Sequence, residues 1–157
     1  MQLNQATDYA FRVVLHLAGL PPGTIVNGQT LAEKERIPQR FLLKIMRSLV
    51  GAGLLKSHRG ADGGFALQKQ PGEITLLSVI EAVEGSVAIH RCLAERSACT
   101  KLCAHQCAVH AALGEIQELF SAALDKVDFA ALAARQEQAE VRSRLRAGNF
   151  QNERSNS

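Results

Sequence analysis

The sequence predicts a mainly α-helical fold that carries one small β-hairpin. Apolar residues recur at helical spacing over most of the chain, and capping or helix-stopping residues separate the periodic stretches. One stretch, residues 54–67, instead has two short alternating runs around a glycine-rich turn, which is typical of a hairpin. The 157 residues are 46% hydrophobic and 21% charged, enough for one well-buried core. We therefore expect one domain with appended segments.

Three helices are predicted before the hairpin. The first covers residues 5–20 and stops at a Pro-Pro-Gly sequence. Thr30 with Glu33 three residues later is typical of a capping box, so a short second helix should begin there. Pro38 ends it and suits the first turn of a third helix. We expect this third helix to bury an apolar face, and a buried leucine is the plainest interpretation of Leu43. The expected face consists of Phe41, Leu42, Ile45, Met46 and Leu49.

The opposite face of the third helix is basic, which indicates nucleic-acid binding. Two short helices joined by a tight turn form a helix-turn-helix, whose second helix enters the major groove of DNA. The hairpin that follows is then a wing, and an arginine at its tip can reach the minor groove. The candidate DNA-binding residues are Gln39, Arg40, Lys44, Arg47, His58 and Arg59.

The charge distribution supports this interpretation. Residues 34–69 contain eight Lys or Arg against two Asp or Glu, a net charge of +6 in a chain whose total is +3. Such a concentration is expected of a surface that contacts the phosphate backbone.

Two further helices are predicted after the hairpin. Residues 74–85 form a helix capped by Thr75, and residues 109–127 form a long one. The long helix has apolar residues at alternating spacings of four and three, which favours a coiled-coil seam with a second copy. Beyond about residue 135 the periodicity is lost, so a fading helix and a disordered tail are expected. The seam consists of Val109, Leu113, Ile116, Phe120, Ala123 and Val127.

All four cysteines lie within residues 92–107. The chain shows no secretory pattern at its start and no apolar run of membrane-spanning length, so we expect a cytoplasmic protein without a membrane partner. In that reducing compartment clustered cysteines favour a metal or redox centre over disulfides. Soft thiolates suit an iron-sulfur cluster, while four thiolates can equally hold a structural zinc ion, although paired CxxC motifs are missing.

Several stretches together resemble the Rrf-type winged helix-turn-helix transcription regulators, which include iron-sulfur assembly regulators, nitric oxide sensors and iron regulators. They are residues 7–18, 38–67 with its RGxxGG wing, 74–85, and the cysteine stretch leading into a long helix. The resemblance covers about residues 1–132. It implies a homodimer that binds a pseudo-palindromic operator in double-stranded DNA, with an iron-sulfur cluster controlling binding.

The resemblance also implies the ligands of the cluster. By position, Cys92, Cys99 and Cys107 match the three cysteines of the family, and a 4Fe-4S cluster is favoured over a 2Fe-2S cluster. Cys103 is the first candidate for the fourth ligand, because it lies four residues from both Cys99 and Cys107 and would share their face on a helical turn. Asp8 is close behind, since it matches the carboxylate that nitric oxide sensors supply from the partner subunit.

Two histidines, His105 and His110, complete the candidates for the fourth ligand. They lie near the region where the iron-sulfur assembly regulators use histidine.

The sequence thus predicts a regulator, most simply a repressor, that senses nitric oxide, iron or redox state, with no catalytic residues. A regulator with structural zinc is the alternative. An iron-sulfur enzyme or electron carrier is disfavoured by the lack of a nucleotide-binding loop, a nucleophile-base pattern and a CxxxCxxC motif. The expected organisation is a winged helix-turn-helix domain at 1–85, a cysteine-rich cluster-binding loop at 86–107, a dimerisation helix and turn at 108–134, and a tail at 135–157.

Overall fold

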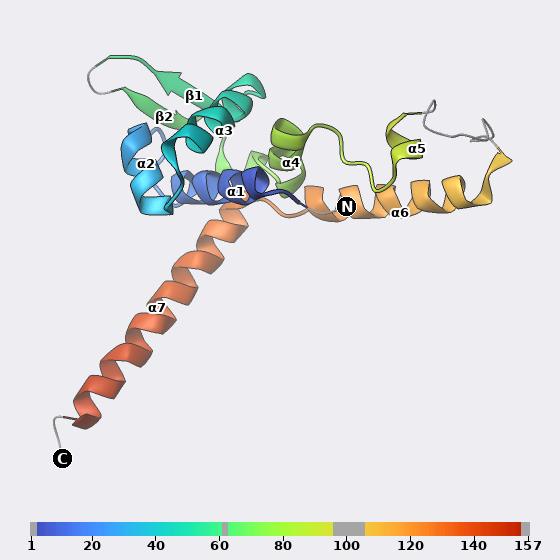
Figure 1. Ribbon diagram of the computed structural model, residues 1–157. Helices are drawn as coiled ribbons and strands as arrows, with labels where there is room; N and C mark the ends of the chain where they lie inside the picture. Colours follow the sequence, from blue (N-terminus) through green and yellow to red (C-terminus); the bar gives the residue numbers. More distant parts are fainter. Residues whose placement is uncertain (1–2, 61–62, 96–105, 155–157) are drawn as a thin grey trace.

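A computed structural model describes residues 3–60, 63–95 and 106–154 (Figure 1). The fold is mainly helical with one two-stranded antiparallel hairpin, which confirms the predicted fold class. No helix in these ranges is long and apolar enough to cross a membrane. In chain order the elements are α1 (Gln5–Ala18), α2 (Gly28–Glu35), α3 (Gln39–Gly51), β1 (Leu55–His58), β2 (Gly64–Leu67), η1 (Pro71–Glu73), α4 (Leu76–Glu84), α5 (Arg91–Ala94), α6 (Ala108–Asp125) and α7 (Phe129–Arg154).

Helix α1 lies at the centre of the core and contacts α2, α3, α4 and α7. It buries residues at spacings of three and four, which place them on one face. Phe129, the first residue of α7, is 1% exposed and lies in the same core, with its ring centroid 6.3 Å from that of Phe11. A side-chain contact of 2.7 Å between His16 Nδ1 and Glu35 Oε1 joins α1 to α2. The buried face of α1 includes Ala10, Val13, Val14 and Leu17.

Helix α2 begins earlier than the capping signal predicts. Asn27 is its N-cap, and its side chain accepts a hydrogen bond of 2.8 Å from the backbone N–H of Gln29. Thr30 lies inside the helix, so the predicted capping box of Thr30 and Glu33 is wrong. Asparagine is as good a cap as threonine, and here the chain is still extended at Asn27. The helix ends at Arg36, whose left-handed backbone (φ 53°) turns the chain towards α3.

The wing is tied to the segment before α2. Strands β1 and β2 pair in the register Leu55 with Leu67 through His58 with Gly64. Val26 and Phe65 also exchange two backbone hydrogen bonds of 2.9 Å, which form an isolated bridge beside β2. Gly64 makes this close approach possible, because a Cβ there would lie 2.4 Å from the carbonyl oxygen of Val26. The wing and the start of α2 therefore form one unit.

The last two helices leave the winged part in different directions (Figure 1). Helix α6 contacts α4 and α5 and has no buried residue. Helix α7 starts in the core and then projects away from it. It continues to Arg154, so the expected fading helix and disordered tail beyond about residue 135 differ from the structure. The segment is rich in Ala, Arg, Gln and Glu, whose high helix propensity does not depend on an apolar face.

Replacing Gly64 by Ala should separate the wing from Val26. Because the added methyl would overlap a backbone oxygen, we expect the free energy of unfolding to fall by about 2 kcal/mol, as for an overpacked core. Urea unfolding followed by circular dichroism measures this change. Gly51→Ala is the matched control, since a methyl group added there would meet nothing within 4 Å, and it should leave stability unchanged or slightly raised. Equal effects of the two substitutions would contradict the role of the bridge.

Candidate functional site

Helix α3 separates a buried apolar face from an exposed basic one. Leu42, Ile45, Met46 and Leu49 are each at most 2% exposed, as predicted. Arg40, Lys44 and Arg47 are exposed, and no described residue forms an ion pair with them. Because these charges face solvent without a described counterion, they are available to phosphate groups.

Phe41 does not belong to the core, in contrast to the prediction. Its side chain is 38% exposed, and its ring centroid lies 6.4 Å from that of Tyr9 on α1. The guanidinium group of Arg40 lies 5.0 Å from the same ring, within the range of a cation-π contact. Phe41 therefore supports Arg40 at the start of α3, which restricts the conformations of this candidate DNA-binding residue.

An open groove lies between the start of α2, helix α3 and the wing. It brings together three of the predicted DNA-binding residues, Gln39, His58 and Arg59, although they come from two separate elements. The groove also contains Asn27 and Gln29, which the sequence did not indicate because their capping role hides them among ordinary helix-start residues. Arg40, Lys44 and Arg47 lie on α3 but do not line the groove.

Leu43 also lines this groove, and the expectation that it is buried is wrong. Its side chain is 48% exposed. The position follows from helix geometry, since Leu43 lies four residues after Gln39 and four before Arg47, on the outward side of α3.

The described cysteines meet at a junction between α5 and α6. Cys107 is the N-cap of α6, and its sulfur accepts from the backbone N–H of His110 at 3.4 Å. The Nδ1 atom of His110 lies 3.4 Å from the sulfur of Cys92 on α5. His90 Nδ1 lies 3.1 Å from the same sulfur, a neighbour that sequence reasoning missed although it precedes Cys92 by two residues. We call these four residues the cysteine junction.

The cysteine junction contains only part of the predicted ligand set. Three predicted candidates, Cys99, Cys103 and His105, lie outside the described residues. Within the described ranges, no three metal-binding side chains are close enough together to hold a metal ion. Asp8 lies in the first turn of α1, where its side chain is 53% exposed and pairs with Arg12 at 2.6 Å.

Comparison with known proteins decides the family. The family model Rrf2, described as iron-dependent transcriptional regulator, matches residues 3–135. The chain belongs to the Rrf2 family. This confirms the resemblance seen in the sequence, and the proteins of this family that the chain matches are transcriptional regulators rather than enzymes.

Relatives within the Rrf2 family match over different lengths. NsrR of Geobacillus kaustophilus is 32% identical over 149 residues, which cover 93% of this chain and 97% of that protein. NsrR of Bacillus subtilis is 31% identical and covers 80% of this chain and 86% of its own. The match to Rv1287 of Mycobacterium tuberculosis, 34% identical, covers 56% of this chain and 55% of that protein. The chain thus spans about half the length of some of the curated relatives it matches.

Solved structures of the Rrf2 family share the fold. CymR, the global cysteine regulator of B. subtilis, superposes with a TM-score of 0.65 at 21% identity, covering 85% of this chain and 97% of that one. T. potens IscR gives a TM-score of 0.66 at 22% identity and covers 88% of this chain and 90% of its own. The winged-helix architecture is therefore confirmed.

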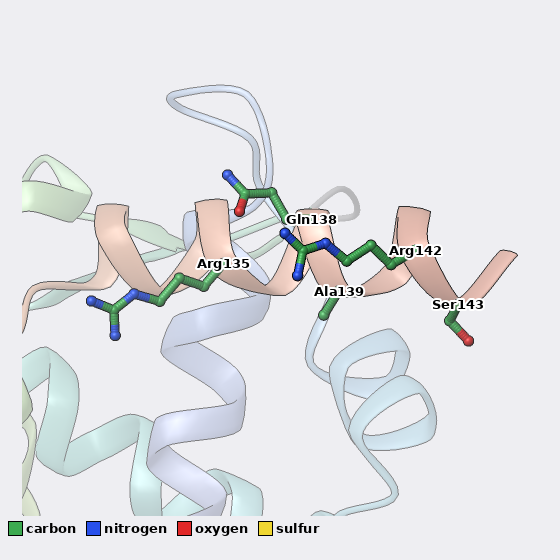
Figure 2. Close-up of a pocket in the computed structure, with 5 residues that line it drawn as sticks. All are labelled: Arg135, Gln138, Ala139, Arg142 and Ser143. Atoms are coloured by element: carbon green, nitrogen blue, oxygen red, sulfur yellow. The ribbon is translucent and has the colours of Figure 1, made fainter. Parts of the chain in front are cut away.

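A second hollow runs along α7 and is separate from the groove. Arg135, Gln138 and Arg142 line it together with Ala139 and Ser143 (Figure 2). All five residues come from α7 alone, so this hollow is the side of a single helix and does not bring distant parts of the chain together. Arg135 and Arg142 nevertheless provide exposed positive charges remote from the wing.

Replacing Arg59 by Ala should weaken binding to a random-sequence DNA duplex. Loss of one charge-assisted phosphate contact corresponds to about 1.5 kcal/mol, or roughly tenfold in affinity. The slope of log affinity against log salt should fall by about 1. Fluorescence anisotropy over a range of salt concentrations measures both effects. Arg135→Ala makes the same charge change on α7 and should alter neither, whereas an unchanged Arg59→Ala affinity at every salt concentration would contradict the wing contact.

Proposed function

We propose that this Rrf2-family regulator is a homodimeric repressor whose operator binding is controlled by an iron-sulfur cluster that responds to nitric oxide, iron or redox state. One observation carries the proposal: Cys92 on α5 and Cys107, the N-cap of α6, both contact His110 at the end of α6 that is remote from the winged part. A sensor at this place can act on α6, whose opposite end is attached to the winged domain.

The chemistry of the described residues fits an iron-sulfur cluster. Both thiols are free and half-buried, so they are accessible as thiolate ligands yet partly shielded from water. Thiolates are the usual ligands of iron in such clusters. Cys99 would supply a third ligand, in accord with the family resemblance, and a 4Fe-4S cluster is favoured over a 2Fe-2S cluster. When bound, the cluster supplies a group whose integrity changes with nitric oxide, oxygen or iron supply.

For the fourth ligand we retain Cys103 first and Asp8 close behind. Asp8 would come from the partner subunit, and its exposed carboxylate on α1 suits that role. Its contact with Arg12 would have to be exchanged for the metal. The ring of His110 is a third candidate that the contact with Cys92 supports, because imidazole nitrogen is also an iron ligand in some clusters.

The chain offers a route from the cysteine junction to the winged domain. At its far end α6 is fixed to that domain, where Thr75 Oγ1 donates to Asp125 Oδ1 at 3.0 Å. Near the cysteine junction, the backbone N–H of Ile89 donates to Gln117 Oε1 at 3.2 Å. Release of Cys92 and Cys107 would remove restraints at one end of α6 and keep those at the other. We infer that α6 then changes its angle to the winged domain. Helix α6 would thus have two orientations, and the cluster would shift the equilibrium between them.

The exposed face of α6 supports the proposed homodimer. Val109, Ile116 and Leu119 are 66%, 53% and 73% exposed, and Phe120 is 38% exposed. Contiguous apolar surface of this kind on one helix usually marks an interface. Three of the four belong to the predicted coiled-coil seam, and Leu119 broadens the face beyond it. Pairing of two such helices would place two winged domains on one pseudo-palindromic operator.

Structural zinc remains the alternative, and the two histidines beside Cys92 would suit it as nitrogen ligands, although within the described ranges no three such side chains lie close enough together to hold a metal ion. Zinc accepts mixed sulfur and nitrogen ligands, and His90 and His110 both approach that sulfur. Protein purified without oxygen separates the two: a brown protein with visible absorption contains iron and sulfide, whereas a colourless protein that contains zinc favours the alternative.

Replacing Cys92 by Ala should abolish iron binding and change operator affinity about tenfold or more, the size of a typical allosteric coupling. The measurements are iron content, visible absorption, and anaerobic binding to duplexes selected from a random library. Cys103→Ala and Asp8→Ala, assayed in parallel, identify the fourth ligand by loss of the spectrum. Ser143→Ala on α7 is the control and should keep both properties. Unchanged anaerobic operator affinity of Cys92→Ala would contradict cluster control.

Replacing Ile116 by Asp should dissociate the proposed dimer. A carboxylate buried without a partner costs about 3 kcal/mol or more, which would weaken association by roughly 150-fold. Sedimentation equilibrium measures the association constant, and circular dichroism shows whether α6 is still helical. Val141→Asp on α7, at a side chain that is 50% exposed, is the matched control and should remain dimeric. A dimeric Ile116→Asp protein would argue against pairing through this face.

A further inference from the structure

A cleft separate from the groove lies between α1, the end of α2 and α7, where α7 leaves the winged part (Figure 1). Its volume is about 700 Å³, and three carboxylates line it, Glu35 from α2 and Glu137 and Glu140 from α7. Arg12 lines it as well, but its guanidinium group pairs with Asp8 at 2.6 Å. We call this site the acidic cleft. Its charge favours a basic group and disfavours an anion.

The two carboxylates that α7 contributes to the acidic cleft have no cationic partner in the described chain. Glu137 and Glu140 are exposed, and no described residue forms an ion pair with either. Glu140 accepts a hydrogen bond of 3.0 Å from Gln136 Nε2, which is a neutral donor. By contrast, Glu35 contacts His16 Nδ1 at 2.7 Å. Two negative charges on α7 are therefore left for a partner from outside the described chain.

The other side of α7 is basic. Arg135 and Arg142 lie seven residues apart, on one side of the helix, and both line the hollow shown in Figure 2. None of the α7 residues that line this hollow also lines the acidic cleft. Opposite charges on a helix surface pair when they are three or four residues apart, and Arg135 and Arg142 have no described ion-pair partner. Helix α7 thus places its unpaired acidic and basic groups on different sides.

We propose that the acidic cleft of one copy receives the basic side of α7 from a second copy, so that two arginines of the second copy approach Glu137 and Glu140. Because the two surfaces lie on different sides of the same helix, the contact is heterologous, and each copy can give one surface and receive the other. The exposed apolar face of α6 takes no part in it. The family model ends at residue 135, so most of this contact lies beyond the part of the chain that the model matches.

The strength of this contact limits where it can act. Exposed ion pairs are weak and are screened by salt, so free protein should associate through α7 only at high concentration and low ionic strength. Two copies held on neighbouring operators have a much higher effective concentration. There the contact would favour joint occupation of both sites, a consequence that rests on the proposed DNA binding, whereas the contact itself does not.

Sedimentation velocity of the full chain without DNA tests the contact. The weight-average sedimentation coefficient of the wild type should rise with protein concentration at low salt, and high salt should abolish this rise. Two double variants alter the contact from either side, Arg135→Glu with Arg142→Glu, and Glu137→Lys with Glu140→Lys. Each should weaken the association about tenfold or more, because like charges then face each other. An equimolar mixture of the two should restore it, since the reversed charges are again complementary.

Arg144→Glu is the matched control and should associate like the wild type. Arg144 is exposed on α7 but lines neither the hollow nor the acidic cleft. A wild-type coefficient that does not change with concentration, double variants that still associate, or a mixture that does not recover would each overturn the inference. Ile116→Asp should dissociate the α6 dimer and keep the salt-sensitive rise, so failure of the proposed dimer and failure of this contact are distinguishable.

Discussion

Burial of one side of α3 is the constraint on which the rest of the site depends. Leu42, Ile45, Met46 and Leu49 pack against the core, so the rotation of this helix about its own axis is fixed. That rotation determines which residues of α3 face outward. The chemistry of the exposed face is therefore set by core packing. A change in the core that rotated this helix would rearrange the basic residues without altering any of them.

The same core also determines where α6 ends and where α7 begins. Helix α1 contacts α2, α3, α4 and α7, and Phe129 at the start of α7 completes the core. The backbone bridge between Thr75 and Asp128 fixes the turn that follows α6. Because the start of α7 lies in the same core as α1, the end of α6 and the start of α7 are attached to the winged domain without a separate C-terminal core in the described residues.

The sequence could predict the helices and the hairpin because their periodicity reflects burial. It could not place Phe41 and Leu43, since an apolar side chain on the outer face looks the same in a pattern as one in the core. The start of α2 could not be predicted either, because it depends on the pairing of Val26 with Phe65, which keeps the chain extended up to Asn27. The full length of α7 could not be predicted from apolar periodicity, because most of this helix packs against nothing in the described chain. At the cysteine junction, the grouping of Cys92 with Cys107 was implied by the family resemblance, while the position of His90 depends on how the chain enters α5.

The bridge between Val26 and Phe65 has a consequence for how this regulator can respond to a signal. It joins the walls of the groove, so the start of α2, helix α3 and the wing are expected to move together as one rigid DNA-binding unit. A signal that reaches this unit through α6 would then leave the internal shape of the unit unchanged. In a dimer, what changes is the distance and the angle between the two DNA-binding units. Operator affinity then depends on whether both units can reach their half-sites on the same side of the double helix at once.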